Sequence, residues 1–187
     1  MPRLAVLASG SGSNFEAIAE KMAGSAHSIA CMICDRREAY VFDRAKKLDI
    51  PAYYVNYKGR DRLLAEEEIK AVLHDEKADL IALAGFMRLL SPDFIDSFPD
   101  HIVNVHPSLL PKYPGTHGIE DGFNSGDMEL GITIHRVDHG LDTGPVIMQK
   151  SFIRRKNEVL HEIESRVHEL EHIWYPAVLL EILDSIK

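Results

Sequence analysis

The chain has 187 residues, of which 21 are basic and 29 acidic, so its formal net charge is −8 with neutral histidines. A chain of this length is most simply one domain, able to bury roughly 70% of the surface that its unfolded form exposes. Its 45% of hydrophobic and 27% of charged residues exclude wholesale disorder. The acidic balance argues against nucleic acids and membrane surfaces as partners, because phosphate-rich partners recruit lysine and arginine.

Two cysteines cannot build a disulfide scaffold, and the N-terminus lacks the charged start and long apolar core of a signal peptide. Apolar runs such as residues 80–87 are far too short to cross a bilayer. We therefore expect a cytoplasmic protein with a single domain over residues 1–187 and no membrane contact.

The first hundred residues alternate between short apolar runs, typical of buried strands, and helical patterns. Strands are expected at residues 3–9, 28–35, 51–55, 79–84 and 101–105. Helices are expected between them, from residue 13 onwards, at 39–48, at 61–74 and after Pro92. This alternation predicts an α/β fold with a Rossmann-like, doubly wound, mostly parallel sheet and right-handed crossovers.

The first helix has sequence signals at both ends. Ser13 with Glu16 three residues later has the spacing of a capping box, and Gly24 suits the helix C-terminus. Beyond residue 106 the pattern changes: a proline-rich loop at 106–117 precedes alternating runs at 130–137 and 145–153. These runs predict antiparallel or edge strands, and residues 159–186 predict one long terminal helix.

The loop after the first strand, residues 10–14 (GSGSN), favours a phosphate ligand. Its glycines let the backbone approach a ligand closely, and the following helix N-terminus presents free N–H groups. No Gly-Lys-Ser/Thr follows, which excludes a Walker loop. A dinucleotide fingerprint would need a third glycine where Phe15 stands, although Asp35 ends the second strand where a ribose-binding acid would lie. From the loop alone, a tight turn without a ligand stays open.

Two metal-like patterns favour structural interpretations. Cys31 and Cys34 lie in a predicted strand, where residues three apart point to opposite faces, so core packing is the favoured interpretation. Residues 168–172 match H-E-x-x-H, but helical geometry turns both histidines mostly towards solvent. We therefore expect no metal. Glu171 lies at the border of the apolar stripe, where it can reach into a cleft.

The strongest constellation follows the fifth predicted strand. Asn104 and His106 are two residues apart, so both side chains leave the strand on one face. An amide donor beside an imidazole suits the oxyanion of an acyl transfer. Asp142, in a second loop, is expected to orient and charge His106. In the proline-rich loop at residues 106–117, the Leu110–Pro111 bond is a candidate for the cis form.

The chain resembles the folate-dependent formyltransferases, and among them the phosphoribosylglycinamide formyltransferases, over essentially its whole length. The matching segments are residues 10–14, 84–92, 104–115, 141–147 and 171–176. The resemblance implies the formyltransferase fold and Asn104, His106 and Asp142 as catalytic residues. It implies substrate binding by Gly12, Ser13, Asn14 and Glu171 and, more weakly, by Gly10 and Ser11. The folate-binding residues that it implies are Arg62, Met87, Arg88, Leu89, Leu90, Asn104, Asp138, His139, Gly140, Leu141 and Asp142.

The activity that the resemblance implies is transfer of the formyl group of 10-formyltetrahydrofolate, a co-substrate, to the amine of phosphoribosylglycinamide in purine biosynthesis. The amine attacks directly while Asn104 and protonated His106 stabilise the oxyanion. The expected partners are small molecules, without nucleic acid or membrane, and the sequence leaves a homodimer open.

Three alternative functions fit the sequence less well. A methionyl-tRNA formyltransferase would need an additional domain and a basic surface, which the length and charge of this chain do not offer. A formyltetrahydrofolate hydrolase shares the catalytic segments but typically carries an extra N-terminal domain. A non-catalytic Rossmann-type nucleotide-binding module would leave Asn104, His106 and Asp142 unexplained.

Overall fold

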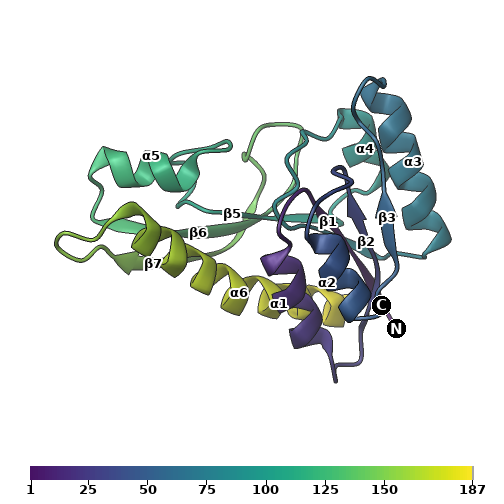
Figure 1. The fold of residues 1–187 in the computed structure, drawn as a ribbon, viewed down its shortest axis with the longest axis horizontal. Helices are drawn as coiled ribbons and strands as arrows, with labels where there is room; N and C mark the ends of the chain where they lie inside the picture. The colour runs from purple at the N-terminus through teal and green to yellow at the C-terminus, as the bar shows by residue number, and fades with distance from the viewer. Residues whose placement is uncertain (187) are drawn as a thin grey trace.

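The computed structural model describes residues 1–186, which form one mixed sheet with helices on both faces (Figure 1). The elements in chain order are β1 (Arg3–Ala8), α1 (Ser13–Met22), β2 (Ser28–Cys34), α2 (Val41–Lys47), β3 (Ala52–Tyr54), α3 (Arg62–Asp75), β4 (Leu80–Leu83), α4 (Pro92–Ser97), β5 (Ile102–His106), α5 (Gly118–Ser125), β6 (Glu129–Arg136), β7 (Val146–Ile153) and α6 (Leu160–Ser185).

The strand order of the sheet is β3-β2-β1-β4-β5-β6-β7. The first five of these strands run parallel, while β6 pairs antiparallel with both β5 and β7. The predicted Rossmann-like sheet with an antiparallel C-terminal portion and a long final helix is thus confirmed. Of the two antiparallel strands, β7 forms the edge and β6 lies inside the sheet.

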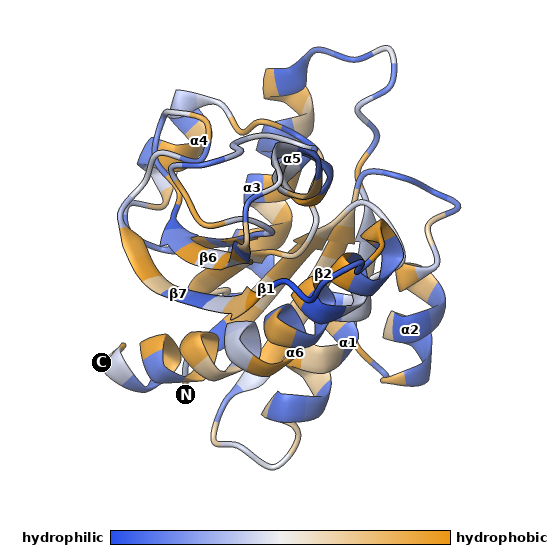
Figure 2. Cartoon of the chain, turned by 90° about the vertical axis from the view of Figure 1, so that its left-hand side faces the viewer, coloured by the Kyte–Doolittle hydropathy of each residue, from blue (hydrophilic) through white to orange (hydrophobic). Residues whose placement is uncertain are grey.

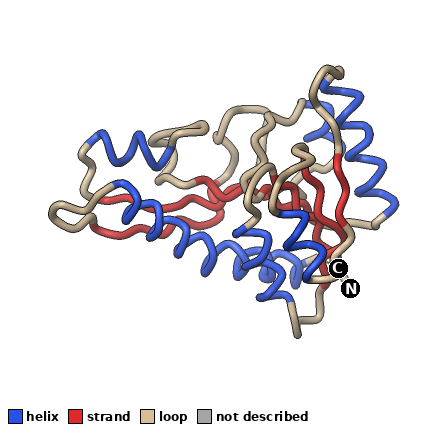
Figure 3. The backbone as a smooth tube through the Cα atoms, in the orientation of Figure 1, coloured by secondary structure: helices blue, strands red, loops and turns tan. Residues whose placement is uncertain are grey.

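Helices lie on both sides of the strands (Figure 3). Each face of the sheet carries its own apolar core, and the strands are largely hydrophobic in the colouring of Figure 2. Leu4 and Val6 point to the core under α1, α2 and α6, and Ala5 and Leu7 point to the core under α3 and α4. The two cysteines divide in the same way, with Cys34 in the first core and Cys31 in the second. Their expected role in core packing is confirmed, and burial raises the pKa of the Cys31 thiol to about 12.

The helix α5 has no counterpart in the sequence prediction. Its glycines explain why, since glycine is a poor helix former. A Cβ at Gly118 would lie 3.1 Å from His106 Nε2, and one at Gly122 would lie 3.0 Å from a methyl group of Leu130. Close packing therefore favours glycine at these two positions, and tertiary contacts stabilise the helix despite its low propensity.

The predicted capping box of α1 is wrong. The N-cap position is Gly12, with a left-handed φ of 76°, and no side chain caps the helix. Glu16 instead forms an ion pair with Arg44 of α2, so its carboxylate is drawn away from the backbone of Ser13. The expected glycine at the other end is confirmed, because Gly24 follows the C-cap residue with a φ of 88°.

The loop after β5 contains a cis peptide bond between Leu110 and Pro111, as expected. In the part of the chain that the structure describes, none of the helices combines the length and the apolarity that crossing a bilayer requires.

Tyr175 anchors α6 to β4 and β5 in the interior of the sheet. Its side chain is fully buried, and its hydroxyl lies 3.1 Å from the carbonyl oxygen of Leu83 and 2.9 Å from that of Val103. Those carbonyls belong to β4 and β5, so one side chain ties the long helix to two neighbouring strands. Burial raises the pKa of this hydroxyl well above its usual value, which keeps it a proton donor.

Replacing Tyr175 with Phe should lower the free energy of unfolding by about 1–3 kcal/mol, because buried carbonyls lose a donor. Urea denaturation measures this difference. Tyr54→Phe is the control, since the Tyr54 hydroxyl bonds only to Asn56 near the surface. Equal stability of the two variants would show that the buried hydroxyl does not contribute.

Candidate active site

The main cavity of the structure, about 540 Å³ in volume, opens at the carboxyl ends of β1, β4 and β5. The strand order reverses between β1 and β4, so the chain leaves these two neighbours towards opposite faces of the sheet. Such a switch point is where open α/β sheets bind ligands. The volume is in the range of small-molecule sites.

Sixteen of the predicted site residues line this cavity, namely Gly10, Ser11, Gly12, Ser13, Asn14, Met87, Arg88, Leu89, Leu90, Asn104, His106, Asp138, Gly140, Leu141, Asp142 and Glu171. Two others do not. Arg62 begins α3 and faces Glu66, with 3.9 Å between Nε and Oε1. His139 lies 2.8 Å from Asp96 on the surface.

His106 ends β5 with its side chain almost fully buried. Its Nε2 lies 2.8 Å from the carbonyl oxygen of Tyr113, and its Nδ1 lies 3.5 Å from Oδ2 of Asp142. Because a carbonyl oxygen only accepts, Nε2 carries the proton of its contact with Tyr113, and Nδ1 is the nitrogen that faces the carboxylate. Gly118 closes off the Nε2 side, so the Nδ1 edge is the one directed at Asp142.

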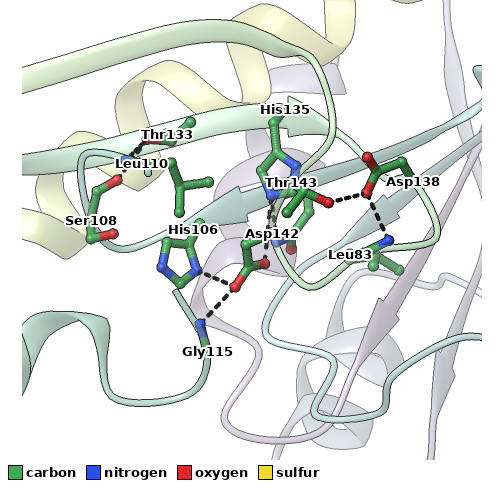
Figure 4. A network of polar contacts seen from close by, with 12 residues as sticks. Leu83, His106, Ser108, Leu110, Gly115, Thr133, His135, Asp138, Asp142 and Thr143 are labelled. Carbon is green, nitrogen blue, oxygen red and sulfur yellow. Dashed lines mark hydrogen bonds and ion pairs between the residues drawn. The ribbon is translucent and has the colours of Figure 1, made fainter. Parts of the chain in front are cut away.

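Asp142 joins three segments of the chain (Figure 4). Its Oδ2 accepts a hydrogen bond of 2.7 Å from the backbone N–H of Gly115 and faces His106. Its Oδ1 lies 3.8 Å from Nε2 of His135 on β6. Asp142 also has a left-handed φ of 55°. A backbone held in this region by its surroundings is typical of functional sites.

Asn104 contacts His135, a residue that the sequence analysis did not select. The side-chain amide of Asn104 lies 3.1 Å from His135 Nε2, while His135 Nδ1 lies 2.8 Å from the carbonyl oxygen of Arg136. Burial lowers the pKa of His135, which favours the neutral ring. That ring donates through Nδ1 and accepts at Nε2, so it holds one N–H of Asn104 and leaves the second for the cavity.

The loop after β1 has its carbonyls and its N–H groups on opposite sides. The carbonyl oxygens of Gly10, Ser11 and Gly12 accept hydrogen bonds from Val41 N, Arg44 Nε and Glu16 N. The backbone N–H groups of Ser11, Gly12 and Ser13 donate to no group among residues 1–186. Successive free N–H groups on a concave backbone form an anion-binding nest.

Glu171 of α6 lies beside this loop with only 5% of its side chain exposed. Its Oε2 accepts hydrogen bonds from Asn14 Nδ2 and His168 Nδ1, both at 3.0 Å. The bond to Glu171 raises the pKa of His168. His168, which was expected to face solvent, is half exposed but lines the cavity with Glu171.

The H-E-x-x-H segment does not converge on a point. The rings of His168 and His172 stack with 6.3 Å between their centres, and His168 is engaged by Glu171. Within residues 1–186 no three His, Cys, Asp or Glu side chains are grouped as metal ligands would be.

Asp35, the candidate ribose-binding acid, forms an ion pair with a cationic side chain instead. Its Oδ2 accepts a hydrogen bond of 2.6 Å from Arg88 Nε, and its side chain is only 1% exposed. The guanidinium of Arg88 also lies over the ring of Tyr57, 5.0 Å from the ring centre. Asp35 and Tyr57 are absent from the cavity lining, so they support Arg88 from behind.

Residues 2–179 match the protein family described as formyl transferase. The chain is 41% identical to the phosphoribosylglycinamide formyltransferase of Bacillus subtilis, over 98% of this chain and 95% of that protein.

Solved structures agree with the sequence comparison. Glycinamide ribonucleotide transformylase 1 from Geobacillus kaustophilus superposes with a TM-score of 0.94 and is 41% identical, covering 98% of this chain and 99% of that one. The phosphoribosylglycinamide formyltransferase of Streptococcus pneumoniae gives a TM-score of 0.92 at 39% identity, over 97% and 99% of the two chains. The chain described here therefore belongs to the formyl transferase family.

Proposed function

We propose that this chain transfers the formyl group of 10-formyltetrahydrofolate to the amine of phosphoribosylglycinamide, a step of purine biosynthesis. The observation that carries the proposal is the convergence of Asn104, His106 and Asp142 on one cavity whose far wall is an anion-binding nest. The names of its relatives, at 41% identity over nearly the full length, support the same pair of substrates.

In this mechanism the amine nitrogen attacks the formyl carbon, and the carbonyl electron pair moves onto oxygen. The free N–H of Asn104 and the Nδ1–H of His106 stabilise that oxyanion. When the bond from carbon to the folate nitrogen breaks, its electron pair stays on that nitrogen, which takes a proton from His106. Asp142 stabilises the charged imidazole and, through a water molecule, accepts the proton that the amine loses.

The two ends of the cavity suit two different ligands. The nest at Ser11 to Ser13 suits the phosphate monoester, and Glu171 beside it offers acceptor oxygens to the hydroxyl or amine groups of the same substrate. Another part of the lining is more apolar and suits the folate, with the side chains of Met87, Leu89, Leu90 and Leu141. Both ligands are anionic, and Arg88 is the cation at the folate end.

One sheet runs through residues 1–186, which supports a single formyltransferase domain over residues 1–187. We propose a cytoplasmic enzyme that acts on small molecules and needs no metal. The nucleotide-binding alternative is disfavoured because the carboxylate that would hold a ribose, that of Asp35, is paired with Arg88.

An absorbance assay with 10-formyltetrahydrofolate, with and without the glycinamide ribonucleotide, tests the activity. Turnover that requires the amine supports transfer. Turnover without the amine would support the hydrolase alternative instead, and no turnover in either case would contradict both.

Replacing His106 with Asn, or Asp142 with Asn, should lower kcat by at least about 100-fold, as expected for acid–base groups. The affinity for the nucleotide should change little, because neither side chain contributes to the nest. Steady-state kinetics with each substrate varied in turn measure both effects. Near-normal kcat in the two variants would remove these residues from the mechanism.

Two substitutions of His135 test its hydrogen bond with Asn104. His135→Leu removes the acceptor for Asn104 and should lower kcat by about 10-fold, the cost of one hydrogen bond worth about 1.4 kcal/mol. His135→Gln keeps an acceptor and should retain more of the activity. His74→Gln, at an exposed histidine of α3, is the control. Equal kcat in the Leu and Gln variants would contradict this role.

The lowered pKa of His135 also predicts a pH dependence of stability. The unfolded chain binds a proton at this residue below about pH 6.5, while the folded protein resists protonation until a lower pH. Acidification below about pH 6.5 therefore favours the unfolded state. The free energy of unfolding of His135→Gln should fall less steeply from about pH 7 to pH 5 than that of the wild type, as urea titrations would measure.

A further inference from the structure

The helix α2 packs against the anion-binding loop, residues 10–14, on the side that faces away from the cavity. Val41 N donates to the carbonyl of Gly10 at 3.3 Å. A Cβ at Gly12 would lie only 2.4 Å from a methyl carbon of Val41, and Gly12 has the left-handed φ that glycine adopts readily. The shape of the loop thus depends on α2, an element with no residue in the cavity lining.

Arg44, one turn further along α2, is the side chain that reaches this loop from behind. Its Nε donates to the carbonyl oxygen of Ser11 at 2.9 Å, and its Nη1 pairs with the carboxylate of Glu16. Its guanidinium carbon lies 5.0 Å from the centre of the Tyr40 ring, and only 18% of the side chain is exposed. Contacts with a loop carbonyl, a carboxylate and a ring fix its position.

A planar trans peptide carries its C=O and N–H on opposite sides. Because Arg44 holds the carbonyl of Ser11 on the outer side of the loop, the N–H of the same peptide, which belongs to Gly12, points to the inner side. Val41 and Glu16 constrain the two flanking peptides in the same way through their backbone N–H groups. Of the three constraints, the one from Arg44 comes from a side chain.

We propose that Arg44 is a positioning residue for the phosphate of the nucleotide substrate, an inference that rests on the function proposed above. It keeps the N–H of Gly12 directed at the phosphate and neutralises Glu16. Without Arg44, the carboxylate of Glu16 would stand unpaired in the first turn of α1, the helix whose N-terminus faces the proposed phosphate site. The unpaired negative charge would repel the phosphate and weaken its binding.

The test compares glycinamide ribonucleotide with the ribonucleoside that lacks the phosphate. The ratio of their kcat/KM values measures what the phosphate contributes. Arg44→Gln should lower this ratio about 10-fold, equivalent to about 1.4 kcal/mol, with kcat and the KM for the folate changed less than about twofold. Arg44→Lys keeps the charge but cannot reach both partners with a planar fork, so its ratio should be intermediate.

Lys46→Gln is the matched control, because Lys46 lies on the same helix, carries the same charge and is exposed. It should behave as the wild type. The proposal is overturned if Arg44→Gln keeps the wild-type ratio, if it loses activity on both nucleotides equally, or if Lys46→Gln lowers the ratio as much. Should Arg44→Gln not fold, Arg44→Lys alone decides: an unchanged ratio overturns the proposal.

A binding measurement separates this proposal from the proposed function. Calorimetric titration with ribose 5-phosphate, and with ribose as the blank, requires no turnover. Wild-type protein that binds ribose 5-phosphate more tightly than Arg44→Gln does, yet transfers no formyl group, would support Arg44 while contradicting the function. If the wild type transfers the formyl group but binds ribose 5-phosphate no more tightly than Arg44→Gln does, the function is supported and the role of Arg44 is contradicted.

Discussion

The reversal of strand order between β1 and β4 is the constraint on which the site depends. The chain leaves β1 into α1 on one face of the sheet and leaves β4 towards α4 on the other, so the two loops separate and a crevice opens. Every proposed ligand contact lies at this carboxyl edge. The antiparallel pair β6 and β7 then extends the sheet, and β6 brings His135 against Asn104.

Much of this arrangement is predictable from the sequence because strand and loop signals are local. The apolar runs define the parallel strands, and their alternation with helices places Gly10 to Asn14, Asn104 and His106 at one edge. Spacing of two residues on a strand also predicts that Asn104 and His106 share a face, and both line the cavity. The opposite directions of Cys31 and Cys34 follow from the same period.

The features that the sequence does not predict depend on contacts between distant segments. The N-cap of α1 is Gly12 rather than Ser13, and Glu16 pairs with Arg44, 28 positions later, instead of capping the helix. The helix α5 contains glycines that close packing against His106 and Leu130 favours. The alternation of β6 marks His135 as polar among isoleucines, but only the pairing of β5 with β6 places it next to Asn104. Arg62 and His139 match a family pattern, yet they lie outside the cavity lining.

The walls of the cavity differ in how they are held. Glu171 and His168 project from a helix of 26 residues whose next turn is anchored in the sheet by Tyr175. The opposite wall consists of loop segments, including the exposed Met87, Leu89 and Leu141. A ligand on the helical wall meets preorganised groups, so little entropy is lost in ordering them. A ligand that covers the exposed side chains of the loop wall also restricts their rotamers, which costs entropy. We therefore expect stricter ligand selectivity at the helical wall than at the loop wall.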